Sequence, residues 1–264
     1  MQEIKEIKVT NNYILIILSD KSEYKISEDD YFEYKFRAKQ SINDKDLETL
    51  KRISNFHNAY LRALNRLKYK DRTEHEIRET MYDEFSLIKL EVDKIINKLK
   101  RYDFINDQRY AEEFIERSQY KLQGFNKIKD GLIKVRINSC LIEQTLIYDE
   151  EKEFDLALKF VEKSITSIKN HNNQQLKNKL RSRLLYRGFK SSLITRVINE
   201  IDIPYDEKAE KQLLKKDFNK IYQRYKSRYD EFELRGRLFN YLARRGYNYE
   251  IINELLDEME NYDE

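Results

Sequence analysis

Glycine and proline, the residues that most often interrupt helices, are scarce in this chain. Its 264 residues include five glycines and one proline, whereas Lys, Glu, Leu and Ile are common. This combination favours long helices over a turn-rich β fold. Charged residues make up 38% of the chain and hydrophobic residues 40%, which argues against simple disorder but leaves much solvated surface. We therefore predict a mainly α-helical protein whose helices form an elongated, curved array.

The first 27 residues follow a different pattern. Three short segments alternate polar and apolar residues or are rich in β-branched and aromatic ones: Ile4–Val9, Tyr13–Leu18 and Ser22–Ile26. Asn11-Asn12 and Asp20-Lys21 lie between them, and Asn and Asp tolerate the backbone angles of tight turns. The pattern predicts a small three-stranded antiparallel sheet.

Helical patterns dominate the remainder. Ser27 can cap a short helix, and a second helix is predicted from Asp44 to Ser54. From Asn58 onward the apolar spacing is helical almost without interruption, and Thr73 and Glu76 form a capping box. Later helices are predicted to begin near the following residues: Asp107, Asn126, Leu141, Glu151, Asn173, Ser191, Asp206, Asp230 and Tyr249. The short connections between them imply antiparallel neighbours.

An internal repeat divides the helical part of the chain. Arg187-Gly188-Phe189 recurs 58 residues later as Arg245-Gly246-Tyr247, each followed by a similar apolar pattern. The glycine suits a helix C-terminus with a left-handed backbone, and the aromatic residue after it can fold back on the helix. We predict an N-terminal sheet with short helices and then four three-helix units. The predicted limits are 1–55, 56–105, 106–149, 150–203 and 204–264.

Residues suited to catalysis or metal binding are sparse. Cys140 is the only cysteine, and His57, His75 and His171 show no zinc-ligand spacing. There is no phosphate-binding GxxxxGK[ST] loop and no GxSxG elbow. We expect no catalytic residue, cofactor or metal, and a buried Cys140. Because the start lacks an apolar signal core and no segment approaches about 18 apolar residues, we expect a cytoplasmic protein without membrane contact.

Basic residues gather in three stretches, although the net charge is only +3. The sharpest holds six cations and no acid: Lys177, Lys179, Arg181, Arg183, Arg187 and Lys190. The second is interrupted only by Asp217: Lys211, Lys215, Lys216, Lys220, Arg224, Lys226 and Arg228. The third is weaker: Arg62, Arg66, Lys68, Lys70 and Arg72. Such clusters can neutralise DNA phosphates or pair with acidic patches of a protein, but an ordinary solvated helix face gives the same pattern.

Two more features leave alternatives open. Tyr222 and Tyr225 lie within the second basic stretch, where they either stack on splayed bases or join Phe218 and Ile221 in a buried helical stripe, which the spacing favours. The last residues of the chain are acidic: Glu250, Glu254, Asp257, Glu258, Glu260, Asp263 and Glu264. We consider three roles for this acidic end: it contacts a partner in a fixed orientation, it shields basic residues of the same chain, or it only keeps the protein in solution.

Several motifs follow one another in a characteristic order. Ala63-Leu64, followed by Lys70-Asp71-Arg72-Thr73-Glu74-His75-Glu76-Ile77, resembles the Ala-Leu helix and the Arg-Ser/Thr-x-x-Glu-Leu/Ile motif of the RecX family. Phe104-Ile105-Asn106-Asp107 with Arg109-Tyr110-Ala111 resembles its Leu-Ile-Asp-Asp-x-x-Tyr/Phe-Ala junction. Gly124, Ile128, Leu132 and the two Arg-Gly-aromatic segments match later repeats. The resemblance covers essentially the whole chain and is to the longer form found in Gram-positive bacteria.

Two turns depart from this family pattern. The glycine usual in the first repeat is absent near Glu84-Phe85, and Arg136 precedes Ile137 where the second repeat normally has glycine. We expect both turns to differ from those of the family, with Asn138 or a longer loop absorbing the change.

The resemblance implies a regulator that lies in the helical groove of RecA polymerised on single-stranded DNA and lowers its strand-exchange, ATPase and co-protease activities. We expect a monomer that acts by binding alone. The candidate contact residues are Lys70, Arg72, Lys177, Lys179, Arg181, Arg183, Arg187, Lys215, Lys216, Lys220 and Arg224. One alternative is an α-helical scaffold for protein partners, which would bind independently of salt. Another is a direct DNA-binding regulator, which would bind duplex tightly without RecA.

Overall fold

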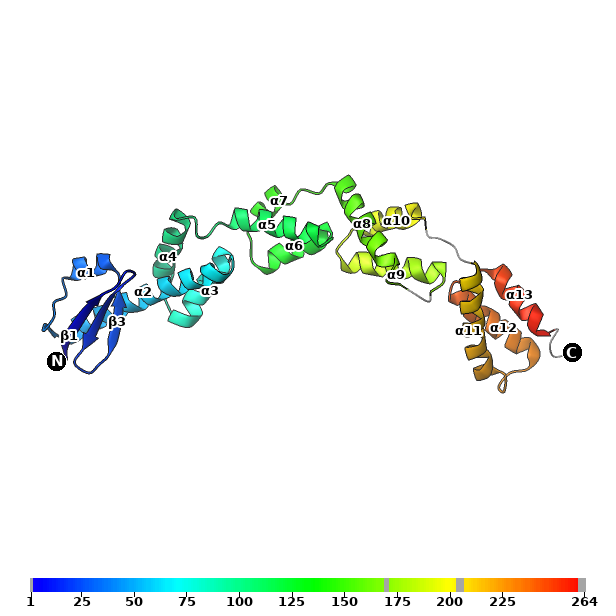
Figure 1. Ribbon diagram of the computed structural model, residues 1–264, viewed down its shortest axis with the longest axis horizontal. Helices are drawn as coiled ribbons and strands as arrows, with labels where there is room; N and C mark the ends of the chain where they lie inside the picture. Colours follow the sequence, from blue (N-terminus) through cyan, green and yellow to red (C-terminus); the bar gives the residue numbers. More distant parts are fainter. Residues whose placement is uncertain (1, 169–170, 203–206, 261–264) are drawn as a thin grey trace. The chain divides into compact units, whose positions relative to one another are not determined.

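The computed structural model describes residues 2–168, 171–202 and 207–260. Within these residues the chain forms thirteen α-helices and four short β-strands, which confirms the mainly helical fold with a small N-terminal sheet (Figure 1). The chain divides into two compact units: Met1–Glu113 with Leu132–Thr145, and Phe114–Gly131 with Leu146–Glu264.

The elements follow one another in a simple order. The first part of the chain contains β1 (Gln2–Val9), β2 (Ile14–Leu18), β3 (Glu23–Ile26), α1 (Glu28–Tyr34), β4 (Ser41–Ile42), α2 (Asp44–Tyr69), α3 (Glu74–Phe85) and α4 (Lys89–Arg101). Next come α5 (Asp107–Tyr120), α6 (Phe125–Lys134) and α7 (Ser139–Thr145). The last part contains α8 (Glu150–Ile165), α9 (Asn173–Tyr186), α10 (Ser191–Glu200), α11 (Glu207–Tyr225), α12 (Glu231–Arg244) and α13 (Tyr249–Glu260).

The predicted helix starts agree with the structure within two residues from α5 to α10 and again at α12 and α13. The predicted caps of Ser27 and Thr73 are also confirmed, because each side chain accepts a hydrogen bond from the backbone N–H three residues later. Three predictions lie outside the described residues: the helix start at Asp206, the unit limit at 203/204, and the acids Asp263 and Glu264.

The N-terminal sheet has four antiparallel strands in the order β3-β2-β1-β4. The three predicted strands are confirmed, and β4 adds a fourth through the pairing of Gln2 with Ile42. Two residues are too short to show an alternating pattern, which is why the sequence did not reveal β4. One face of the sheet buries Ile4, Ile16 and Leu18, and α2 covers it in the shared core.

Helix α2 differs from its prediction. The sequence predicts two helices, ending at Ser54 and starting near Asn58, but the structure has one continuous helix from Asp44 to Tyr69. Its first half packs against the sheet, and its second half packs Ala59 and Ala63 against α3 and α4. Continuous packing on both sides removes any reason for a break. The predicted boundary between residues 1–55 and the first three-helix unit, 56–105, therefore falls inside α2.

Two left-handed turns end α9 and α12 as predicted. Gly188 and Gly246 have φ angles of +88° and +85°. The N–H of the aromatic residue after each glycine donates back to a carbonyl in the last helical turn: Phe189 to Leu184 at 3.2 Å, and Tyr247 to Leu242 at 3.3 Å. This Schellman geometry satisfies carbonyls that the helix leaves unpaired.

Two further helices end in a left-handed residue that is not glycine. Arg136 after α6 has a φ angle of +59°, and the Ile137 N–H donates to Leu132 O at 3.1 Å, as in the glycine turns. Ser86 after α3 has a φ angle of +50°, but the Leu87 N–H donates to Met81 O, six residues back, at 3.4 Å. The turn after α6 thus keeps the geometry of the glycine turns, which its arginine did not lead us to expect, whereas the turn after α3 departs from it. Burial of the apolar residue that follows, Leu87 or Ile137, offsets the backbone cost of about 1–2 kcal/mol for a left-handed residue with a side chain.

A recurring hydrogen bond joins these turns to an earlier helix or to the residue just before one. In each case the acceptor is the carbonyl just before the left-handed residue. The donor–acceptor pairs are Asn55 Nδ2 with Phe85 O at 2.9 Å, Thr73 Oγ1 with Val135 O at 3.1 Å, Gly124 N with Arg187 O at 2.8 Å, and Asn172 Nδ2 with Arg245 O at 2.9 Å. The last three donors precede the first residue of α3, α6 and α9.

Two carboxylates, the half-buried Asp107 and the buried Glu153, support two of these contacts. Asp107 accepts the N–H of Glu74 at 2.8 Å, and Glu153 accepts the N–H of Phe125 at 3.1 Å. Burial raises the pKa of both carboxyl groups. Asp107 and Glu153 thus each cap the first residue of an earlier helix, 33 and 28 positions before them in the chain. The sequence did not reveal these two caps, because the chain contains so many other acids.

The helices of the last part form two cores. Helices α8, α9 and α10 share one core around Ala157, Leu184 and Phe189. Helices α11, α12 and α13 share another around Phe218 and Leu238. The limits of the four three-helix units remain a prediction.

The left-handed turns give a first test of stability. Replacing Arg136 by glycine should raise the free energy of unfolding by about 0.5–1 kcal/mol, because glycine adopts positive φ without steric cost. Gly188→Ala should lower it by at least about 2 kcal/mol, since a Cβ there would lie 2.4 Å from the backbone N of Lys127. Urea unfolding measures both. Lys129→Gly is the matched control, because Lys129 lies within the right-handed part of α6. It should lower the free energy of unfolding by about 1 kcal/mol. If Arg136→Gly and Lys129→Gly lower it equally, the left-handed backbone at Arg136 does not favour glycine.

The buried cap at Glu153 gives a second test. Because its pKa is higher in the folded than in the unfolded chain, its contribution to stability is complete below the usual glutamate pKa and is lost as pH rises through the folded-state value. Glu153→Gln cannot ionise but can still accept the Phe125 N–H. Its unfolding free energy relative to the native chain should therefore increase between about pH 4 and pH 7. Glu162→Gln controls for the loss of one exposed charge. If the unfolding free energy of Glu153→Gln relative to the native chain fell as pH rose, the raised pKa of Glu153 would be contradicted.

Candidate nucleic-acid interface

Helix α9 carries the sharpest basic cluster of the sequence. Asn172 caps its start by accepting the Gln175 N–H at 2.8 Å. Leu180 and Leu184 are fully buried against α8 and α10, and they fix which face of the helix points outward. Lys179 and Arg183 are exposed as a result.

The arginines of this cluster have neutral partners. Arg181 Nη1 donates to Asn178 Oδ1 at 3.4 Å, and Arg183 Nη1 donates to Ser167 Oγ at 2.8 Å. Among the residues that the structure describes, no acid forms an ion pair with the six cations from Lys177 to Lys190. Most of this positive charge is therefore left without an acidic partner among these residues, although Lys190 interacts electrostatically with the buried Glu153.

Arg187 also holds the fold together. Its Nη1 donates to Lys121 O, just past the end of α5, at 2.8 Å. Its guanidinium lies 5.0 Å from the centre of the Phe160 ring, which is a favourable cation–π contact. The sequence predicts only a binding role for Arg187, whereas the structure also ties it to two earlier helices.

A groove opens between α8 and α9 beside these arginines. Its volume is about 440 Å³, and its lining consists of Phe160, Ser164, Ser182, Arg183, Tyr186 and Arg187. Tyr186 is 77% exposed. The Nζ of Lys127 lies 3.8 Å from the centre of its ring and donates to the Tyr186 carbonyl at 3.0 Å. The sequence did not point to Tyr186 or Lys127, because 59 residues separate them and neither stands out alone.

The structure divides the second basic cluster on α11. Lys211 pairs with Glu207 at 3.0 Å and with Glu254 at 3.3 Å, and Lys215 pairs with Glu258 at 3.5 Å. The acidic helix α13 thus shields part of α11, one of the roles considered for the acidic end.

Three other cations of α11 lie along one exposed stripe at four-residue spacing: Lys216, Lys220 and Arg224. Phe218 and Ile221 are buried, and Tyr222 stacks on Phe218 with the ring centres 5.6 Å apart. This confirms the interpretation of these aromatic residues as part of the core.

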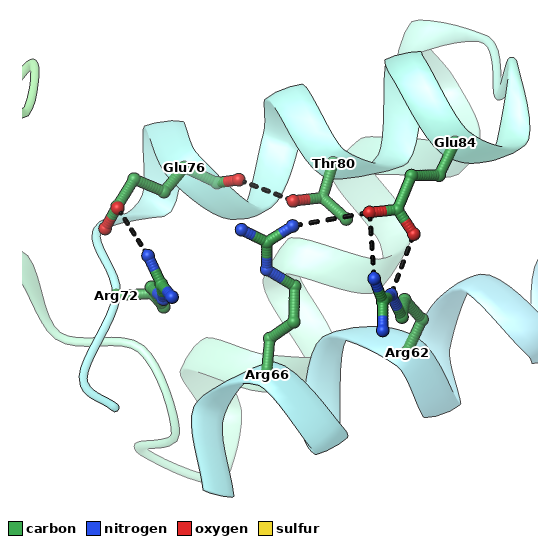
Figure 2. A network of polar contacts seen from close by, with 6 residues as sticks. All are labelled: Arg62, Arg66, Arg72, Glu76, Thr80 and Glu84. Carbon is green, nitrogen blue, oxygen red and sulfur yellow. Dashed lines mark hydrogen bonds and ion pairs between the residues drawn. The ribbon is translucent and has the colours of Figure 1, made fainter. Parts of the chain in front are cut away.

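The third basic stretch is largely neutralised. Figure 2 shows Arg62 and Arg66 of α2 reaching Glu84 of α3, at 2.7 and 3.4 Å. Arg72 pairs with Glu76 at 2.9 Å. The hydrogen bond from Arg62 lowers the pKa of the Glu84 carboxyl group. Lys70 is exposed at the end of α2.

The predicted burial of Cys140 is wrong. Cys140 is exposed because it lies in the first turn of α7, whose inward face is occupied by Ile142. Within the described residues, no group of three or more His, Cys, Asp or Glu side chains is arranged to hold a metal ion. Among residues 2–168, 171–202 and 207–260, no helix has the length and apolar content needed to span a membrane.

Comparison with known proteins assigns the family. The family model "RecX, third three-helix domain" matches residues 150–198 and again residues 205–256. Regulatory protein RecX of Lactococcus lactis subsp. lactis (strain IL1403) is 31% identical over 257 residues, covering 96% of this chain and 95% of that protein. Regulatory protein RecX of Streptococcus gordonii is 28% identical over 259 residues, covering 96% and 98%.

A solved structure agrees in fold. A crystal structure of regulatory protein RecX matches with a TM-score of 0.59 at 22% identity, covering 76% of this chain and 100% of the other. At this identity the likeness concerns the fold. With the near-complete match to the Lactococcus relative, the sequence and the helical units together show that this chain belongs to the RecX family of regulatory proteins.

Proposed function

We propose that this protein binds RecA polymerised on single-stranded DNA, in the bacterial cytoplasm, and restrains the filament. It acts by binding alone, without catalysis or cofactor, and lowers the ATPase, strand-exchange and co-protease activities of RecA. Membership in the RecX family supports this proposal.

The observation that carries the proposal is the uncompensated charge of α9. Elsewhere in the described structure, cations are commonly paired with acids, as in Arg62 with Glu84, Arg78 with Asp93 at 2.6 Å, and Arg196 with Glu151 at 3.0 Å. The cations of α9 have no such partners among the described residues. An external partner with negative charge, either DNA phosphates or acidic residues of RecA, can supply them.

The stripe of α11 offers a second surface of the same kind, formed by Lys216, Lys220 and Arg224. Lys215 and Arg72 contribute less in this proposal, because each already has an acidic partner. Lys70 is exposed and remains a candidate.

Binding alone can regulate a filament. A ligand shifts an equilibrium between two states only by the difference between its affinities for them. If the cationic helices contact several RecA subunits or phosphates in one state of the filament, that state is favoured, and ATP hydrolysis by RecA slows. The four tandem units, 56–105, 106–149, 150–203 and 204–264, are proposed to present these helices in series.

Steady ATP hydrolysis by RecA tests the proposal. Adding the purified protein to RecA, single-stranded DNA and ATP should reduce hydrolysis at sub-stoichiometric amounts. Reversing two charges, Lys177→Glu with Lys179→Glu, should raise the concentration that gives half inhibition by about tenfold, because charges that attract phosphates become repulsive.

The matched control reverses two exposed cations of α8, Lys152→Glu with Lys163→Glu, and so makes the same change in net charge. It should inhibit like the native chain. No inhibition by the native chain at any ratio would overturn the function. Equal inhibition by the two double variants would remove α9 from the interface, and binding unaffected by salt would favour a protein scaffold instead.

A further inference from the structure

The groove between α8 and α9 has the composition of a binding site. Two arginines, two serines, a tyrosine and a phenylalanine line it, with no acid among these described residues. Guanidinium and hydroxyl groups donate hydrogen bonds to phosphate oxygens, and aromatic rings accept stacked bases. The lining therefore suits an anion that carries a flat ring.

Neutral contacts hold both arginines beside the groove. Arg183 donates to Ser167 Oγ at 2.8 Å, and that hydroxyl donates in turn to the carbonyl of Ser164 at 2.7 Å. Arg187 donates to Lys121 O at 2.8 Å and lies over the Phe160 ring. A guanidinium has five N–H donors, so these contacts leave donors and the full charge of each arginine for a ligand.

The aromatic surface is also in place. Tyr186 follows Arg183 by three residues, so both lie on the same face of α9. Tyr186 is 77% exposed although it lines the groove. Lys127 contacts its ring at 3.8 Å and adds a third cation beside it.

The C-terminal helices provide an internal comparison. A shift of 57 residues aligns the buried Glu153 and Ala157 of α8 with the buried Glu210 and Leu214 of α11. Phe160 then corresponds to Asp217. The shift of 58 residues found for the later helices makes Arg183 equivalent to Tyr241 and Arg187 equivalent to Arg245.

The equivalent arginine is neutralised in the C-terminal helices. Arg245 pairs with Asp217 at 2.8 Å and donates to the hydroxyl of Tyr241 at 3.1 Å. Asp217 also accepts the hydroxyl of Tyr247 at 2.8 Å. The three-helix fold therefore does not require an open cationic groove at this position, and the equivalent position of the C-terminal helices holds an ion pair instead.

We propose that the groove between α8 and α9 binds one nucleotide of single-stranded DNA, with the phosphate held by Arg183 and Arg187 and the base stacked on Tyr186. This inference deepens the proposed function and rests on it. Single strands fit this groove better than duplex, because the bases of a duplex are already stacked inside the helix.

The test measures binding of a fluorescein-labelled oligothymidylate to the full chain by anisotropy, without RecA. Arg183→Tyr installs the residue of the C-terminal helices at an exposed position and should weaken binding about tenfold. It should also reduce the slope of log affinity against log salt by about 0.7, the value for one phosphate contact on a single strand. Tyr186→Ala should weaken binding about tenfold, whereas Tyr186→Phe keeps the ring and should bind like the native chain.

Lys152→Tyr is the matched control for Arg183→Tyr. It removes one exposed cation from α8, the other helix of the groove. Lys152 lies twelve residues before Ser164, about 18 Å along the helix, and the variant should bind like the native chain. A strand of the same length with abasic sites should bind the native chain and Tyr186→Ala equally, because no base remains to stack. Thermal unfolding of each variant shows whether the fold is retained.

Other outcomes overturn the inference. If folded Arg183→Tyr and Tyr186→Ala bind oligothymidylate like Lys152→Tyr, or if duplex binds as tightly as the single strand, the groove is not a nucleotide site. Either result leaves the proposed function standing as long as the native chain still inhibits RecA, since that assay does not depend on these variants. Absence of both activities in the native chain would reject both.

Discussion

The helical part of this protein depends on hydrogen bonds to the carbonyls that precede the left-handed residues after α3, α6, α9 and α12. A helix leaves its last carbonyls unpaired, and burying them without a donor is costly. Three of the donors, Thr73, Gly124 and Asn172, lie just before the start of an earlier helix. One turn thus ends its own helix and also fixes the start of another. Gly124 shows how close this packing is, since a Cβ there would come within 2.7 Å of Phe189 N.

The same scaffold carries very different surfaces. Cations that look alike in the sequence fall into three physical groups. Arg62 and Arg66 are neutralised by Glu84, Lys211 and Lys215 are shielded by α13, and the cations of α9 have only neutral partners among the described residues. Within the three basic stretches, the last group, the exposed stripe of α11 and the exposed Lys70 keep their charge for an external ligand. For a regulator that acts by binding, this distribution matters more than the net charge of +3.

Local rules explain which parts of the fold could be predicted. Caps, apolar periodicity and the Arg-Gly-aromatic motif act over a few residues, and they placed most helix starts and the turns at Gly188 and Gly246 correctly. The failures have long-range causes. Helix α2 is continuous because it packs on the sheet and on α3 and α4 at once. Arg136 adopts a left-handed backbone because Ile137 is buried after it.

The sequence by itself determined the helical class, the N-terminal strands, the repeat at residues 187 and 245, and the three basic stretches. Only the tertiary structure decided which cations remain unpaired, that Cys140 is exposed, and that Phe160, Arg183 and Tyr186 border one groove. The reason is physical. Helix formation depends on neighbours within about four residues, whereas ion pairs, buried caps and grooves depend on which distant residues the packed helices bring together.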